Sequence, residues 1–254
     1  MSLRWLTAFI DRPAPVLDAC AGFWARVLQA RRSPVRGPSG EFSTLLPSDG
    51  DAFVRLQAVR EGPGGVHLDV HVDDVDVAAA HAVRLGATAR PQRGYVTLAS
   101  PAGLVWCLVP AQGPAQVRPR PVTRPDGSVS LLDQLALDIP PADYEAECAF
   151  WAAMTGWEVR GGSRPEFRSL VRPEGMPLRL LLHRLDTPPA DGLASCHLDL
   201  AATDRDAEVT LHEAWGARVV ARFAGWTSLA DPTGLPYCVT GRDPWTGLVP
   251  DRRR

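Results

Sequence analysis

The chain has 254 residues, of which 45% are hydrophobic and 22% charged, and this composition is typical of a globular protein. A formal net charge of −2 argues against a nucleic-acid or anionic-membrane partner, and all 27 basic residues are arginines spread among acidic ones. The five cysteines form no C-x-x-C pair, which argues against a zinc knuckle and predicts a reduced, cytoplasmic setting. The first residues lack the pattern of a signal peptide, and no apolar run approaches the length of a membrane span, so neither is expected.

The N-terminal part begins with a strand pattern over 5–10 and continues into a helix. Pro13 and Pro15 suit the first helical turn, and Val16, Cys20 and Phe23 recur at the spacing of one helix face. Strand patterns at 42–46 and 53–59 follow, separated by glycines and prolines that predict turns. This order predicts a helix packed with one face on a sheet.

The next strand alternates in polarity. His67 and Asp69 fall on one face, whereas Leu68 and Val70 fall on the other. A helix over 74–85 should begin at an N-cap aspartate and end at a glycine, and strands near 95–99 and 105–109 close the unit. We expect the apolar face of the strand to pack on the helices and the polar face to line a cavity.

The second half of the chain repeats the first. His67 to Ala87 aligns without a gap to His197 to Ala217. Flanking blocks recur in the same order: Phe23-Trp24 matches Phe150-Trp151, and Ser100-Pro101-Ala102-Gly103-Leu104 matches Asp231-Pro232-Thr233-Gly234-Leu235. Corresponding strands are expected at 133–139, 167–171, 178–183, 226–230 and 236–240, with helices after Pro140-Pro141 and over 204–215.

The repeat defines the expected domains. We predict domain 1 over residues 1–110, a proline-rich, semi-rigid linker over 111–130 and domain 2 over 131–247. Each domain should contain two βαβββ modules. His81 and His212 fall on the second helix of their domains, and we expect them at the surface or at an interface.

These blocks resemble the tandem glyoxalase/bleomycin-resistance/dioxygenase proteins of the vicinal-oxygen-chelate (VOC) superfamily. The similarity rests on the Phe-Trp helix, the His-Leu-Asp strand and the Ser/Asp-Pro-x-Gly-Leu hairpin, and it covers nearly the whole chain. The resemblance implies an α+β fold in which paired βαβββ modules form a curled, cup-shaped mixed sheet with helices outside. It also implies that a ligand or a metal ion sits in the cup.

The resemblance implies metal ligands on four cup-facing strands. Its ligand positions fall on Thr7, Gln57, His67 and Cys107 in the first repeat, and on Gln134, His183, His197 and Cys238 in the second. Cysteine replaces the expected closing glutamate in both repeats. We therefore expect no metal in the first repeat, and a divalent metal in the second only as an alternative to a polar pocket. Both cysteines are expected mainly as buried spacers.

Three functions remain open at this stage. The leading prediction is binding of a small organic molecule, without an obligatory metal, by His67, Asp69, Gln57, Gln134, His183, His197 and Asp199. The first alternative is a metal-dependent lyase, isomerase or dioxygenase acting from domain 2. The second is a structural or regulatory module whose cups are filled by its own side chains. The expected partner is a small-molecule ligand, and the chain is expected to be a monomer or a homodimer.

Overall fold

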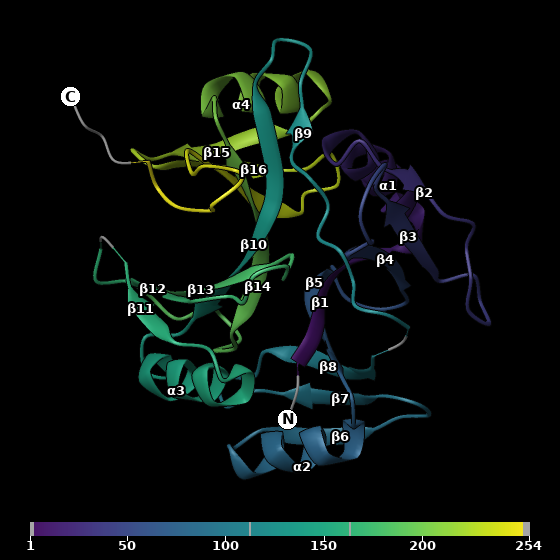
Figure 1. Cartoon of the computed structure of the whole chain (residues 1–254), viewed down its shortest axis with the longest axis vertical. Helices are drawn as coiled ribbons and strands as arrows, with labels where there is room; N and C mark the ends of the chain where they lie inside the picture. Colours follow the sequence, from purple (N-terminus) through teal and green to yellow (C-terminus); the bar gives the residue numbers. More distant parts are fainter. Residues whose placement is uncertain (1–2, 112, 163, 251–254) are drawn as a thin grey trace. The chain divides into compact units, whose positions relative to one another are not determined.

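The computed structural model describes residues 3–111, 113–162 and 164–250, which form four successive βαβββ modules (Figure 1). The first repeat contains β1 (Leu3–Pro13), α1 (Ala14–Val27), β2 (Arg31–Arg32), β3 (Phe42–Leu46), β4 (Val54–Val59), β5 (Gly65–Val72), α2 (Val75–Arg84), β6 (Thr88–Pro91), β7 (Val96–Ala99) and β8 (Val105–Pro110). The second repeat contains β10 (Val129–Ile139), α3 (Tyr144–Thr155), β11 (Val159–Gly161), β12 (Phe167–Leu170), β13 (Arg179–Arg184), β14 (Ser195–Ala202), α4 (Arg205–Ala214), β15 (Arg218–Arg222), β16 (Trp226–Ala230) and β17 (Pro236–Thr240). A short strand between the repeats, β9 (Val122–Thr123), pairs with β10.

The strands form two mixed sheets with the same topology. Their orders are β2-β3-β4-β1-β5-β8-β7-β6 and β11-β12-β13-β10-β14-β17-β16-β15. In each sheet the fifth strand of the repeat lies parallel to the eighth, and the pairs β3·β4, β7·β8, β12·β13 and β16·β17 are antiparallel. The expected α+β fold with two glyoxalase-like domains is thereby confirmed.

The contacts divide the chain into two compact units, and each unit combines modules from both repeats. Unit 1 comprises Met1–Phe9, Val66–Val117 and Leu135–Cys196, so it contains the second module of the first repeat and the first module of the second repeat. Unit 2 comprises Ile10–Gly65, Arg118–Gln134 and His197–Arg254, so it contains the other two modules. Residues of β1 and of β10 belong to both units.

Each unit has an aromatic core between its helices and its sheet. In unit 1, Trp106 of β8 packs against Phe150 and Trp151 of α3, with ring centroids 6.2 and 5.3 Å away. In unit 2, Tyr237 of β17 packs against Trp24 of α1 at 5.2 Å. Burial of such large rings is a major stabilising contribution, of about 1.5–3 kcal/mol for a large apolar side chain. It also fixes which face of β8 and of β17 points toward the helices.

The second helix of each repeat begins at the aspartate that its sequence predicts. The Asp74 side chain accepts a hydrogen bond from the Val77 amide, and Asp204 accepts one from the Ala207 amide, each 2.9 Å long. These bonds satisfy amides that have no partner within the helix. Gly86 and Gly216 follow the helices with positive φ angles of 108° and 98°, as expected of helix-terminating glycines.

Several features differ from the sequence-based expectations. The strands β2, β6, β11 and β15 were not predicted, because these sheet-edge segments are short or carry mostly exposed and polar side chains. His212 lies not at the surface but fully buried in unit 2, where it is held by hydrogen bonds within a polar network. The sequence shows this residue only as one polar position on an amphipathic helix.

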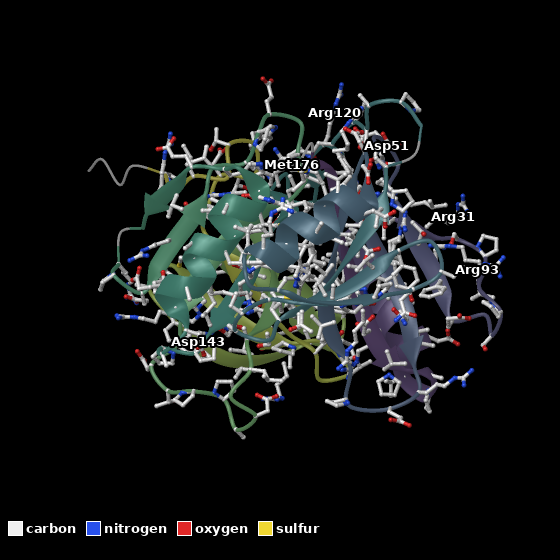
Figure 2. The ribbon with its side chains drawn as sticks, turned by 90° about the horizontal axis from the view of Figure 1, so that it is seen from below. Arg31, Asp51, Arg93, Arg120, Asp143 and Met176 are labelled. Atoms are coloured by element: carbon white, nitrogen blue, oxygen red, sulfur yellow. The ribbon has the colours of Figure 1, made fainter. Side chains whose placement is uncertain are left out.

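Charged residues lie both at the surface and in the core, where Arg124, Asp133, Glu147 and Glu208 are buried. Arg31, Arg93 and Arg120 are exposed and project outward in Figure 2. Among the described residues, none of the helices has both the length and the apolar character that crossing a membrane requires. All five cysteines are free thiols and all are buried.

Candidate functional site

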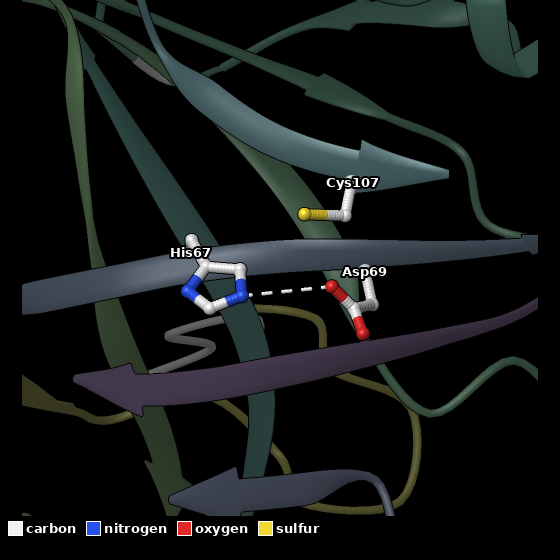
Figure 3. A group of neighbouring side chains, drawn as sticks. All are labelled: His67, Asp69 and Cys107. Carbon is white, nitrogen blue, oxygen red and sulfur yellow. Dashed lines mark ion pairs between the residues drawn. The ribbon is translucent and has the colours of Figure 1, made fainter. Parts of the chain in front are cut away.

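In unit 1, a histidine, an aspartate and a cysteine meet on the two parallel strands β5 and β8. His67 and Asp69 lie on the same face of β5, and Leu68 between them is fully buried on the other face. The His67 Nε2 atom lies 3.5 Å from Asp69 Oδ1 (Figure 3). Cys107 of β8 is the register partner of Asp69, and one ligand atom from each of the three residues lies within 4.8 Å of the others.

Neighbouring side chains hold this cluster in place. The Phe9 ring stacks on the His67 imidazole, with a centroid distance of 4.7 Å and an interplanar angle of 9°. Thr97 Oγ1 lies 3.8 Å from Cys107 Sγ. The imidazole keeps 14% of its side-chain surface exposed, whereas the aspartate keeps 7%. The cluster is therefore a polar patch that solvent reaches mainly through the histidine.

Unit 2 contains the equivalent cluster on β14 and β17. His197 Nε2 lies 3.3 Å from Asp199 Oδ1 and 3.6 Å from Cys238 Sγ, and Asp199 and Cys238 are register partners. The buried Gln134 amide of β10 donates a 2.6 Å hydrogen bond to Asp199 Oδ2. Asp199 Oδ1 is buried and accepts no hydrogen bond from a described group. Gln134 thus orients this carboxylate by a hydrogen bond, and the His197 imidazole lies beside it.

The remaining predicted site residues lie elsewhere. His183 belongs to β13 in unit 1, where its Nδ1 atom lies 2.7 Å from Asp138 Oδ1 and its ring lies 4.8 Å from the Phe167 ring. Gln57 belongs to β4 in unit 2, where it pairs in register with Phe42 of β3. The structure therefore forms three separate groups. His67 lies beside Asp69, Gln134 lies beside Asp199 and His197, and His183 pairs with Asp138.

Cys107 and Cys238 stand at ligand positions that the resemblance implies, and both were expected mainly as buried spacers. Both are buried, and the parallel pairing of the fifth and eighth strands places each cysteine opposite the aspartate of the His-Leu-Asp strand. That pairing joins residues about forty positions apart, so no local pattern reveals it.

A buried ionic network supports β17 from the side opposite Cys238. The Tyr237 hydroxyl and the His212 Nδ1 atom lie 2.9 Å apart, and His212 Nε2 lies 3.1 Å from Glu208 Oε1. Arg124, from the segment between the repeats, hydrogen-bonds both oxygens of Glu208. Burial acts to raise the pKa of Glu208, but His212 and Arg124 outweigh it and lower this pKa to about 2. The ionised network anchors α4 to β17.

The donor set of each cluster can be compared with those that metals prefer. Iron(II) oxygenases use two histidines and one carboxylate on one face of the ion, and each cluster offers a single histidine. The clusters therefore do not fit that centre. Imidazole nitrogen, thiolate sulfur and carboxylate oxygen are together the donors that zinc accepts, and His197, Asp199 and Cys238 fit this chemistry.

The described residues also enclose cavities away from these clusters. One of about 310 Å³ lies in unit 2, between the segment 119–123 and the residues Val27, Leu45, Phe53 and Leu131. Another of about 200 Å³ lies in unit 1, next to Trp5 and Met176. Neither cavity is lined by the residues predicted to bind a ligand.

The fold and the internal repeat are those of a protein built from glyoxalase-like domains. The family model of the glyoxalase-like domain matches residues 7–109 and 134–240, so the chain belongs to this family. A search of curated proteins found no match.

Solved structures with the same fold cover nearly the whole chain. A mutant of 4-hydroxymandelate synthase from Streptomyces coelicolor has a TM-score of 0.63 at 15% identity, covering 97% of this chain and 96% of its own. The 2,3-dioxygenase LapB from Pseudomonas sp. KL28 has 0.63 at 12% identity, covering 94% and 92%. The Mn(II)-bound glyoxalase from Novosphingobium aromaticivorans has 0.59 at 16% identity, covering 94% and 81%. At these identities the likeness shows the fold alone.

Proposed function

We propose that this protein binds a small organic molecule, and that the cluster of His197, Asp199 and Gln134 in unit 2 forms the polar part of its binding site. The observation that carries this proposal is the 2.6 Å hydrogen bond from Gln134 to Asp199, which holds the carboxylate beside the partly exposed imidazole. A polar group whose orientation is fixed before binding loses less entropy when the ligand arrives. The ligand is expected to present a hydrogen-bonding group to His197, and its binding does not require a metal ion.

A thermal-shift screen tests the proposal. The full chain is treated with a chelator and screened against small aromatic and cationic compounds, because a ligand that binds only the native state must raise the melting temperature. For each compound that does so, His197→Ala and Gln134→Leu should weaken binding about tenfold or more. The matched control is His67→Ala in unit 1, which should leave the affinity unchanged. A shift that survives His197→Ala places the ligand elsewhere and contradicts the proposal.

A second candidate function is metal-dependent lyase or isomerase chemistry from unit 2. The observation that favours it is the spacing of His197, Asp199 and Cys238, which fits zinc. Bound there, a divalent ion would polarise a substrate oxygen, while Gln134 would hold the Asp199 carboxylate in place. Turnover of 2-oxo or hydroxy-carbonyl substrates that appears on adding Zn²⁺, Ni²⁺ or Mn²⁺ and disappears in Asp199→Asn supports this candidate. Stable folded protein with no turnover under any of these ions removes it.

The free thiols indicate in which cellular compartment the protein would carry out either function. All five cysteines are reduced and buried, and an environment that keeps thiols reduced suits them. We propose a cytoplasmic location on this basis.

A further inference from the structure

The cavity of about 310 Å³ in unit 2 is separate from the polar cluster of that unit. It is enclosed by the end of α1, by β3 and β4, by the start of β10 and by the inter-repeat segment 119–123. Its buried walls are mainly apolar and include Val27, Leu45, Phe53, Val54, Leu131 and Leu132. An apolar cavity of about 150 Å³ in another protein takes up benzene, so this one has room for about two rings.

Prolines line this cavity from two sides. Pro119 and Pro121 belong to the inter-repeat segment, and Pro47 follows β3 directly. Proline has no backbone N–H, so these three positions present ring carbons but no amide donor to an occupant. The amide of Arg120, between two of the prolines, already donates a 3.3 Å hydrogen bond to Asp49 Oδ1. The lining therefore favours an occupant that needs no hydrogen-bond donor.

The charged side chains of the lining lie at the mouth and pair with each other. Arg120 Nε lies 3.6 Å from Asp49 Oδ2, and these side chains are 89% and 45% exposed. Deeper in, the buried Ser130 hydroxyl already contacts Arg124 and Glu208. No charged side chain among the described lining residues is buried. A charged occupant would lose its hydration without gaining a partner, whereas a neutral apolar molecule would not.

Gln29 ties the inter-repeat segment to the end of α1. Its Nε2 atom donates a 3.1 Å hydrogen bond to the Thr123 carbonyl oxygen. Gln29 has a φ of 45°, and it is the only non-glycine residue with a positive φ in the described part of the chain. Glycine usually fills this left-handed position after a helix, but glycine has no side chain that could reach the segment. The strained glutamine thus holds one edge of the cavity through an exposed bond that can open and re-form.

We propose that this cavity is a second binding site, which takes a neutral, apolar molecule of one or two rings, and that the inter-repeat segment is its cover. The molecule enters when the contacts of Gln29 and Asp49 with the segment open. The site differs from the His197 cluster, because it recognises its occupant by shape and apolar contact rather than by a hydrogen bond to a histidine. It forms where the connection between the repeats passes over the first module.

Binding of a neutral fluorophore to the full chain tests this site. Phenylnaphthylamine, whose emission rises in apolar surroundings, is titrated in parallel with anilinonaphthalene sulfonate, which carries the same rings and a negative charge. We expect saturable binding of one phenylnaphthylamine per chain. The affinity for the sulfonate should be lower by about tenfold or more, because the buried walls offer its charge no partner.

Substitutions at the cavity locate the fluorophore. Leu45→Trp fills the buried wall, and Ser48→Trp adds the same bulk at the exposed mouth, where it does not disturb the core. Each should weaken binding about tenfold or more, and the second remains informative if the first unfolds. Ser39→Trp is the matched control, because Ser39 is exposed on the same module and does not line the cavity. Circular dichroism confirms folding of every variant.

The cover has a kinetic test of its own. Gln29→Ala removes the bond to the inter-repeat segment, so stopped-flow fluorescence should show faster association and faster dissociation of phenylnaphthylamine. Unchanged rates in this variant contradict the role of the segment as a cover.

Three results overturn the site itself. They are equal affinity for the two fluorophores, full binding in both Leu45→Trp and Ser48→Trp, and loss of binding in His197→Ala, which would place the fluorophore at the polar cluster. The small-molecule site at His197 is tested with other compounds and other variants, so failure of either proposal leaves the other standing.

Discussion

The Trp24 indole donates a 3.1 Å hydrogen bond to Asp231 Oδ2, and this buried bond joins the first module of the chain to the last within unit 2. Unit 1 has a counterpart, because the Trp151 indole donates a 2.8 Å hydrogen bond to Glu147. The carboxylate comes from a turn in unit 2 but from the helix itself in unit 1. In each unit a buried carboxylate thus accepts a hydrogen bond from a tryptophan of the helix, although this carboxylate comes from different positions in the two repeats.

The bond between Trp24 and Asp231 predicts a specific loss of stability. Trp24→Phe should lower the free energy of unfolding by about 2–4 kcal/mol, because it removes a hydrogen bond to a charged group and leaves a space in the aromatic core. Trp245→Phe is the control, since Trp245 is 55% exposed and should cost less than about 0.5 kcal/mol. Urea unfolding followed by circular dichroism measures both. Equal effects of the two substitutions would contradict the prediction.

The low pKa of Glu208 predicts a loss of stability in acid. Its folded-state pKa of about 2 lies below the value near 4.5 of an unfolded glutamate, so it stabilises the fold above pH 4.5 and this stabilisation disappears as the pH falls toward 2. The difference corresponds to about 3 kcal/mol. Glu208→Gln should lower the melting temperature at pH 7 and flatten its dependence between pH 4.5 and 2. Glu213→Gln, exposed on the same helix, should keep the slope of the original protein.

Two glycines with the same backbone angle offer a matched test of close packing. Gly62 and Gly64 both have φ of +77°, but a Cβ atom at Gly64 would lie 1.9 Å from the Asp11 carbonyl oxygen, whereas nothing lies within 4 Å at Gly62. Gly62→Ala should cost about 1 kcal/mol for the left-handed backbone alone. Gly64→Ala must also displace the main chain, so we expect a cost about 2 kcal/mol larger. Thermal unfolding of both variants would reveal the difference, and equal melting temperatures would count against the clash.

The Cys20 thiol is expected to be inert in the folded protein. Burial raises its pKa above the usual range, and the neighbouring Asp231 carboxylate, 3.5 Å away, raises it further. Because the thiolate is the reactive form, iodoacetamide at pH 8 should leave Cys20 unlabelled until the protein is unfolded. Peptide mass spectrometry after timed labelling gives the result. Labelling of native protein at the rate of a free thiol would contradict this prediction.

The βαβββ modules and the polar faces of the strands could be predicted from the sequence, because both follow from the spacing of apolar residues along a short stretch of chain. On β5, Leu68 and Val70 are buried, as their alternation with His67 and Asp69 predicted, although Asp69 is buried too. Local patterns alone do not place Cys107 beside Asp69, because the two residues meet through pairing with a distant strand; only the resemblance put Cys107 at a ligand position. The exchange of modules between repeats is also invisible in the sequence, because similar apolar faces are buried whichever module becomes the partner.

The composition of the compact units has a consequence for how the chain can be divided. A fragment that ends at the proline-rich segment contains one complete repeat but only half of unit 1 and half of unit 2. Two such fragments would have to associate in solution to form the units, and the fraction associated would fall on dilution. In the intact chain the covalent connection keeps the partner modules at a high effective concentration that does not change with the amount of protein. Joining the repeats therefore makes the assembly of both units independent of how abundant the protein is.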